Sequence, residues 1–203
     1  MSTLLRYAGF LFVLFFMPRL NYADAGIGDS AAVQVRHLDS ALLESMQAGP
    51  ALSVGDRYHA LEPVIEQAFD LPLMTSLAVG PDWASFSGEQ QRAAITAFTR
   101  LTIASYAHNF RVYNGERFEI DANIVSRGTD KVVQTHLIPR HDQPVSLIYR
   151  MRESGGIWKI IDVYYGSISQ LTTRRSDFAG PLASGGAQAL VTHLNSLSDD
   201  LMK

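Results

Sequence analysis

One stretch in the second half of the chain constrains the fold more than any other. Residues Ile157 to Ser169 read Ile-Trp-Lys-Ile-Ile-Asp-Val-Tyr-Tyr-Gly-Ser-Ile-Ser, which predicts a strand that is apolar on both faces. Regular alternation gives two faces, with Trp158, Ile160, Asp162 and Tyr164 on one and Ile157, Lys159, Ile161, Val163 and Tyr165 on the other. An antiparallel strand with one face in solvent alternates apolar and polar residues. This strand therefore needs cover on both faces, which we expect from helices on one and an apolar ligand on the other.

The N-terminus has the pattern of a secretory signal peptide. Arg6 supplies a positive charge, Phe10 to Met17 form an apolar run, and Ala23-Asp24-Ala25 gives a cleavage site with two small residues. The apolar run is too short to span a bilayer. We predict that residues 1–25 are removed on export and that residues 26–203 form a single domain. The alternative is an uncleaved membrane anchor.

Composition excludes several classes of function. The chain has no cysteine, so disulfides, thiolate metal sites and cysteine nucleophiles are ruled out. Its formal net charge is −3 and its 17 basic residues form no extended basic run, which argues against a nucleic-acid partner. The exported domain must therefore be stabilised by its hydrophobic core alone.

The order of periodic segments predicts the fold class. Helical spacing of apolar residues marks segments 35–48, 58–69, 71–79 and 87–108, and the last opens with the capping box Ser87-x-x-Gln90. Alternating residues then mark strands at 118–124, 131–138, 145–151 and 157–165, followed by helices at 168–178 and 187–201 that Gly180-Pro181 separates. We predict an α+β fold in which N-terminal helices pack on one side of a curled antiparallel sheet, with an apolar pocket between them.

No catalytic or metal-binding motif is present, and the six histidines lack metal-ligand spacing. We therefore expect no enzyme activity, no metal and no cofactor. Asp162 is the one suspicious carboxylate, because a carboxylate among apolar neighbours must be paired or hydrogen-bonded. An ion pair with Arg150 or Arg152 is the structural interpretation.

Two other functions stay open on the residues alone. In a small cone-fold isomerase or dehydratase, Asp162 would act as a catalytic acid beside a tyrosine such as Tyr106 or Tyr149. A module that only binds a membrane complex would have a fully packed core.

The basic doublet Arg174-Arg175 either forms a solvated face or steers an anionic headgroup at a pocket mouth.

The chain resembles the MlaC-type (toluene-tolerance) periplasmic phospholipid-binding family, and within it the hopanoid-biosynthesis-associated HpnM branch. The similarity runs from Arg57 to Phe178 and rests on these stretches: Leu61-Glu62-Pro63-Val64-Ile65, Phe69-Asp70-Leu71-Pro72-Leu73-Met74, Leu77-Ala78-Val79-Gly80 with Trp83, Gln90-Gln91-Arg92, Phe98-x-x-Leu101, Ser105-Tyr106, and Trp158-Lys159-Ile160-Ile161-Asp162-Val163 with Ser169. The resemblance implies a periplasmic carrier that moves phospholipid or hopanoid between the inner and outer membranes. It further implies an inner-membrane ABC lipid transporter complex and an outer-membrane lipoprotein complex as partners, and it assigns no catalytic role to Asp162.

For such a carrier we expect the lipid pocket to be lined by sheet residues and by the long helix. The candidate lipid-binding residues are Tyr106, Phe110, Ile120, Val133, Leu147, Tyr149, Ile161, Val163 and Tyr165. On the opening strand we expect the lipid to touch the face of Ile161, Val163 and Tyr165.

Overall fold

The computed structural model describes residues 28–203. The predicted signal peptide and its cleavage site lie outside the described residues. Within residues 28–203, no helix combines the length and the apolar character needed to cross a membrane.

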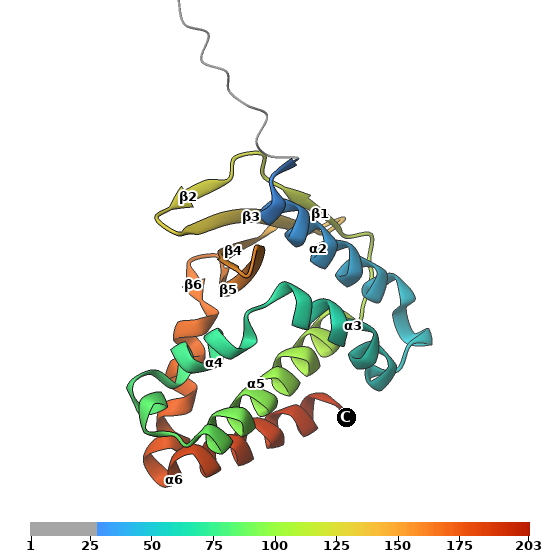
Figure 1. Cartoon of the computed structure of the whole chain (residues 1–203). Coiled ribbons are helices and arrows are strands. Elements are labelled where there is room, and N and C mark those ends of the chain that lie inside the picture. The colour runs from blue at the N-terminus through green and yellow to red at the C-terminus, as the bar shows by residue number, and fades with distance from the viewer. Residues whose placement is uncertain (1–27) are drawn as a thin grey trace, which may run out of the picture.

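Five helices form the first half and the C-terminus of the described chain, and each follows a residue whose side chain accepts a hydrogen bond from the first turn. Asp29, Ser53, Asp70, Ser87 and Ser169 are these N-caps, and Ser87 forms the predicted capping box with Gln90. The bounds are α2 Ser30–Ala48, α3 Val54–Ala68, α4 Leu71–Val79, α5 Gly88–Asn109 and α6 Gln170–Leu201, with short 3-10 helices η1 Gly49–Ala51 and η2 Gly80–Ser85 (Figure 1).

The strands form one antiparallel sheet in the order β1-β3-β4-β5-β6. Their bounds are β1 Arg117–Ile120, β2 Val125–Arg127, β3 Asp130–Ile138, β4 Val145–Ser154, β5 Ile157–Tyr165 and β6 Ile168–Ser169. The strand predicted at 118–124 is divided, because β1 and β2 pair one after the other along the same edge of β3. The chain leaves the ladder between them.

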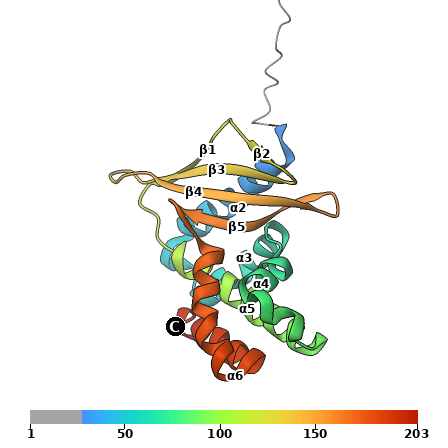
Figure 2. The ribbon, with the colours of Figure 1, turned by 90° about the vertical axis from the view of Figure 1, so that its left-hand side faces the viewer.

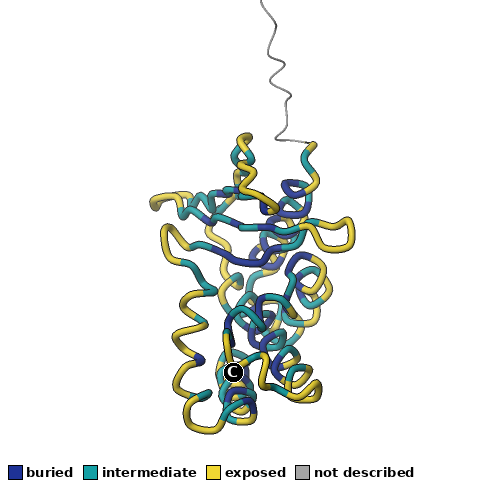
Figure 3. Tube along the Cα trace, turned by 60° about the vertical axis from the view of Figure 1, so that its left-hand side comes forward, coloured by how far each residue is buried: buried dark blue, intermediate teal, exposed yellow. Residues whose placement is uncertain are grey.

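The helices lie on one face of this sheet, as the α+β prediction required. Figure 2 shows the strands across the top of the view with α3, α4, α5 and α6 below them. Helix α2 packs on the same face, since its Asp39 accepts a hydrogen bond from Thr135 of β3 at 3.0 Å, and Thr135 pairs with the inward-facing Leu147. Buried residues lie in the central strands and on helix faces that turn toward the sheet or toward a neighbouring helix (Figure 3). The core therefore lies between the sheet and the helices.

Strand β5 departs from the predicted alternation at one residue. Arg150 pairs with Asp162 and Met151 pairs with Ile160, so Ile161 is an extra residue, a β-bulge. Residues paired across a ladder point to the same face, and the bulge therefore places Ile160 on the same face as Val163 and Tyr165. The predicted division of β5 into two faces is wrong beyond Ile160.

The predicted ion pair of Asp162 is also wrong. Arg150 and Arg152 instead bind Asp130, whose side chain lies between them with Nε–O distances of 2.7 Å to each arginine. Hydrogen bonds from Arg152 and Arg150 lower the pKa of Asp130 below its usual value. Asp130 outcompetes Asp162 because it pairs with Arg152 across β3 and β4 and has Arg150 beside it on the same face.

Asp162 has a structural role at the other edge of β5. It accepts hydrogen bonds from the Ser169 hydroxyl at 2.7 Å and from the Leu171 backbone N–H at 3.0 Å. Helix α6 begins at Gln170, so the carboxylate neutralises an unpaired N–H in its first turn. Asp162 therefore fixes where α6 leaves the sheet.

Helix α6 is interrupted later than the sequence predicted. Its backbone leaves helical geometry at Gly185 and Gly186, where Gly186 has φ of 60° and ψ of −145°, and Pro181 is accommodated inside the preceding helical arm. Residues 170–184 form a first arm and residues 187–201 a second. Glycine is required at Gly186, because side chains disfavour this backbone conformation.

Candidate functional site

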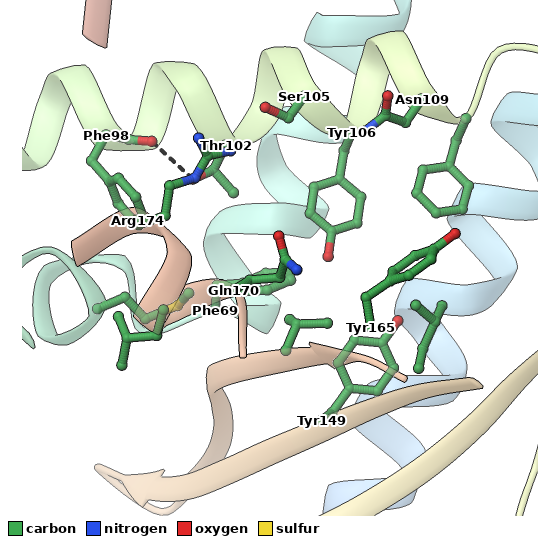
Figure 4. A pocket seen from close by; sticks show the side chains of 15 residues that line it. Phe69, Phe98, Thr102, Ser105, Tyr106, Asn109, Tyr149, Tyr165, Gln170 and Arg174 are labelled. Atoms are coloured by element: carbon green, nitrogen blue, oxygen red, sulfur yellow. Dashed lines mark hydrogen bonds between the residues drawn. The ribbon is translucent and has the colours of Figure 1, made fainter. Parts of the chain in front are cut away.

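An apolar cavity of about 170 Å³ lies between the sheet, α5 and the first arm of α6 (Figure 4). Tyr106 extends from α5 toward the strands, while Tyr149 and Tyr165 extend from β4 and β5 toward α5. The lining residues are Phe69, Met74, Phe98, Thr102, Ser105, Tyr106, Asn109, Phe110, Leu147, Tyr149, Val163, Tyr165, Gln170, Leu171 and Arg174.

The lining divides into an apolar floor and a polar rim. Six residues of the floor are buried: Phe69, Met74, Phe98, Leu147, Tyr149 and Val163. The polar lining residues are at least partly exposed: Thr102, Ser105, Asn109, Gln170 and Arg174. This arrangement suits an amphiphile, with its apolar part inside and its polar group at the rim.

The strands position the floor through their register. Leu147 and Tyr149 are two residues apart on β4, so they share a face, and they pair with Tyr165 and Val163 on β5. Phe69 is held at the far edge of β5, where it forms a parallel bridge to Ile160. The backbone N–H of Asp70 donates to the Ile160 carbonyl at 2.9 Å, which fixes the start of α4 against the strand.

Aromatic rings form a continuous wall on the helix side of the cavity. Tyr106 stacks on Phe110 with ring centroids 5.6 Å apart and an interplanar angle of 9°. Its ring also meets Phe69 edge-on at 5.5 Å, and Phe110 continues the row to Phe118. Such contacts hold flat apolar surfaces in place.

A buried arginine fixes the end of this wall. Arg57 of α3 is buried and donates hydrogen bonds to the carbonyls of Ser45, Gly49 at 2.7 Å, Leu52 at 3.1 Å and Phe110 at 3.4 Å. These acceptors lie at or just beyond the C-terminal ends of α2 and α5, where carbonyls lack helical partners and carry partial negative charge. Burial lowers the pKa of the guanidinium. Arg57 thus ties the Phe110 end of α5 to α2.

The hydroxyl groups of Tyr106 and Tyr149 enter the cavity without hydrogen-bond partners among the described residues. Burial raises the pKa of both side chains, and the nearby Asp39 adds to the effect. Both hydroxyls therefore stay protonated at neutral pH and can donate to a ligand, but neither can act as a base.

Asp39 lies under the sheet close to these tyrosines and is 3% exposed. Its Oδ2 accepts from the Thr135 hydroxyl, while Oδ1 has no partner among the described residues. Burial raises the pKa of Asp39 to about 7, against the weaker opposing effect of the Thr135 hydrogen bond. The carboxyl group is thus partly protonated near neutral pH.

The geometry does not support an acid catalyst in this cavity. Asp162 does not line it, and both of its carboxylate oxygens are already hydrogen-bonded to the start of α6. Among residues 28–203, no group of three or more His, Cys, Asp or Glu side chains could hold a metal ion. The cone-fold enzyme hypothesis required Asp162 at the base of the pocket, and the structure places it elsewhere.

Comparison with known proteins places the chain in a family. A family model described as MlaC protein matches residues 36–196. The chain belongs to the MlaC family. The solved structure of a phospholipid-binding protein from Ralstonia solanacearum, in complex with a phospholipid, has the same fold with a TM-score of 0.75. The two sequences are 23% identical, and the match covers 86% of this chain and 99% of that one.

Six of the nine candidate residues lie together in this MlaC-family cavity: Tyr106, Phe110, Leu147, Tyr149, Val163 and Tyr165. The other three lie elsewhere. Ile161 is buried at the bulge, and Val133 is packed in the core opposite Tyr149. Ile120 lines a separate depression between β1 and α2. The expected face of β5 therefore includes Val163 and Tyr165 but not Ile161.

Apart from Tyr106, Phe110 and the Arg174 alternative, the sequence analysis missed the residues that the helices contribute to this MlaC-family cavity. Phe69, Met74 and Phe98 lie on apolar stripes whose spacing does not separate pocket from core, and Gln170 and Leu171 lie in the segment predicted only as a helix over 168–178. One signal was available on α5, where Thr102, Ser105 and Asn109 recur at three- and four-residue spacing beside an apolar stripe. A polar strip beside an apolar stripe is the ordinary pattern of an amphipathic helix, so it indicates where α5 leaves the core but is not specific to a cavity.

Proposed function

We propose that this protein is a periplasmic lipid-binding carrier that moves phospholipid or hopanoid between the inner and outer membranes. In this proposal it is the exported component of an ABC-type lipid transport system. It receives lipid from, or delivers it to, an inner-membrane ABC transporter complex and an outer-membrane lipoprotein complex. The observation that carries the proposal is the cavity with an apolar floor and a polar rim in a chain of the MlaC family.

The wider assignment has further support. The Ralstonia solanacearum protein with the same fold binds a phospholipid, and the pattern of residues 1–25 fits export to the periplasm. Residues 26–203 would form the single lipid-binding domain. The similarity to the HpnM branch is the reason to include a hopanoid beside phospholipid as cargo.

Energetics favour a simple apolar pocket for this task. Each buried methylene contributes about 0.8 kcal/mol, so two long acyl chains supply tens of kcal/mol of gross burial energy, well above the cost of association. The cavity of about 170 Å³ is smaller than the roughly 300–1,000 Å³ of sites that hold drug-sized ligands. A two-chain lipid therefore requires the cavity walls to move apart. We expect this movement where the first arm of α6 packs on the sheet.

Two neighbouring residues of β4 provide a matched test. Leu147 lines the cavity, while Ile148 points to the opposite face of the sheet. Wild type, Leu147→Trp and Ile148→Trp are exported to the periplasm of a Gram-negative host, purified without detergent and examined by native mass spectrometry. We expect lipid bound to wild type and to Ile148→Trp, and lipid lost from Leu147→Trp because the indole fills the cavity.

Far-UV circular dichroism and melting curves identify a variant that fails to fold. If Leu147→Trp unfolds, Val163→Phe on β5 replaces it, because Val163 lines the same cavity. The proposal is overturned if wild-type protein carries no lipid in repeated preparations and also takes up none from phospholipid vesicles.

A further inference from the structure

Among residues 28–203, a single charged side chain lines the cavity. Of the fifteen lining residues, Arg174 alone carries a charge at neutral pH, and the lining includes no Asp or Glu. The remaining polar groups at the rim are hydroxyls and amides. An apolar chamber whose only charge is one cation matches a ligand with one anionic group.

Arg174 is available to a ligand at its position on α6. Its side chain is 30% exposed, and its ion pair with Asp177 on the next turn is long, with 3.6 Å from Nη1 to the carboxylate oxygen. Asp177 is itself 44% exposed, and pairs of this kind contribute little because water screens them. The guanidinium therefore loses little stabilisation when it leaves Asp177 to bind another anion.

The adjacent arginine differs in both respects. Arg175 donates to the Leu77 carbonyl of α4 through Nη2 at 2.5 Å and Nε at 3.2 Å, and it does not line the cavity. It fastens α6 to α4. The basic doublet thus has two functions, since one arginine is structural and the other faces the cavity.

Two amides reinforce the rim. Asn109 of α5 and Gln170 of α6 line the cavity, and their side chains have no hydrogen-bond partner among the described residues. In contrast, the hydroxyls of Thr102 and Ser105 are occupied by helix carbonyls at 2.8 and 2.7 Å. The nitrogen donors at the rim that a ligand can use are therefore Arg174, whose ion pair is long, and the two amides.

We propose that Arg174, assisted by the Asn109 and Gln170 amides, binds the phosphate of an amphiphile whose chains enter the cavity. The carrier then selects phosphate-bearing lipids over neutral amphiphiles with the same chains. A guanidinium presents paired N–H donors that match two phosphate oxygens. This inference rests on the proposed lipid-carrier function and goes beyond it by naming the ligand class and the residue that selects it.

A competition between two lipids tests the inference. Dioleoyl phosphatidic acid and dioleoylglycerol share both acyl chains and differ by the phosphate alone. Delipidated wild type, Arg174→Gln, Arg174→Lys and Arg175→Gln are incubated with an equimolar mixture of the two in neutral carrier vesicles, and native mass spectrometry gives the ratio bound.

We expect wild type to favour the phosphatidic acid and Arg174→Gln to lower the bound ratio about tenfold, because the variant loses hydrogen bonds to a charged group. Arg174→Lys keeps the charge but loses the paired donors, so it should retain part of the preference. Arg175→Gln should match wild type, and Asp177→Asn, which removes the competing carboxylate, should raise the ratio.

The outcomes separate this inference from the function on which it rests. If all variants bind lipid in the wild-type ratio, the inference is overturned while the carrier function stands. If wild type takes up neither lipid, both fail. Inorganic phosphate and glycerol 3-phosphate are titrated separately at millimolar concentration. We expect wild type and Arg174→Gln to give the same result with each of them. If either compound binds in a way that requires Arg174, the residue forms a site for free phosphate, and its role in lipid selection is overturned.

Discussion

At the scale of single residues, two buried carboxylates show how differently one chemical group is used in this fold. Asp162 has both oxygens hydrogen-bonded at the start of α6. Asp39 has one oxygen bonded to Thr135 and one without a partner among the described residues. Burial, which the Thr135 hydrogen bond offsets only in part, raises the pKa of Asp39 to about 7, so this carboxyl couples the stability of the sheet to pH.

Asp39 should make the protein less stable as pH rises. The folded state binds the Asp39 proton more tightly than the unfolded chain, where the pKa is 3.8, so stabilisation is complete below about pH 4 and is lost as pH rises through 7. Between pH 5 and 8 this contributes a loss on the order of 3 kcal/mol in the free energy of unfolding. Urea denaturation across that range measures it.

Asp39→Asn removes the titrating group and should flatten this pH profile relative to wild type. Asp82→Asn, an exposed change of the same kind on η2, serves as the control and should leave the profile unchanged. Parallel profiles for wild type and Asp39→Asn would contradict the prediction.

Asp162→Ala should destabilise the protein through the start of α6. It leaves the Leu171 N–H and the Ser169 hydroxyl without the carboxylate, at a cost of about 1–3 kcal/mol. The free energy of unfolding from urea titrations measures this, with Asp82→Ala as the control. Bound lipid per folded molecule should stay at the wild-type level, and a selective loss of lipid would show that Asp162 has a role in the cavity.

The sequence predicted the residues of the cavity where local alternation holds and failed where partners come from a distance. Leu147 and Tyr149 follow directly from the spacing on β4. Arg150 and Arg152 were assigned to Asp162 because it lies on the next strand, yet Asp130 on β3 presents its carboxylate between them. Which of two carboxylates forms the ion pair with an arginine depends on side-chain geometry, and strand spacing in the sequence does not contain that information.

At the scale of elements, the break in α6 decides which part of the helix reaches the cavity. The first arm carries Gln170, Leu171 and Arg174 to the rim, while the second arm places Leu190 and Leu194 in the core. The sequence predicted two helices here but placed the break at Gly180-Pro181. Proline is tolerated at Pro181, whereas the backbone at Gly186 is accessible to glycine and strained for other residues.

Two glycine substitutions compare the interruption of α6 with an ordinary position inside a helix. Gly186→Ala should lower the free energy of unfolding by about 1–3 kcal/mol, because φ of 60° with ψ of −145° is unfavourable for a residue with a side chain. Gly55→Ala in α3 has space for the added methyl group, with Ser53 Oγ at 3.8 Å, and should raise it by up to about 1 kcal/mol. Guanidinium titrations of both variants check this, and equal effects would contradict it.

At the scale of the whole molecule, helices on one side of an antiparallel sheet follow from the order of periodic segments, and this part of the prediction is confirmed. The order of helices and strands does not predict where a gap remains between the helix layer and the sheet. The cavity lies between α5, the first arm of α6 and the sheet, and its walls are held by contacts between distant parts of the chain, such as the Phe69 bridge to β5 and the Arg57 hydrogen bond to Phe110. The cavity lies between the helices and the sheet, where the fold prediction placed the pocket, and not on the second face of the sheet, where the doubly apolar strand had suggested a ligand.

Delipidation should lower the melting temperature of the whole domain. A ligand at one hundred times its dissociation constant stabilises the folded state by about 2.7 kcal/mol, and 1 kcal/mol shifts the midpoint of a domain of this size by about 2–4 °C. Differential scanning calorimetry of lipid-loaded and delipidated protein should therefore show a difference of roughly 5–11 °C. Leu147→Trp should show no difference, and an equal response in that variant would place the lipid outside the cavity.

The bulge at Ile161 has a consequence for comparing this chain with its relatives. Because Ile161 has no partner on β4, a homologous strand without the extra residue keeps the same wall only if the alignment gap falls at that position. With the gap anywhere else on β5, part of the strand would be misaligned, so that residues facing the pocket in one protein would be compared with outward-facing residues in another. Residue profiles of the cavity across such relatives are therefore meaningful only when the alignment is anchored on the pairs Met151–Ile160 and Tyr149–Val163.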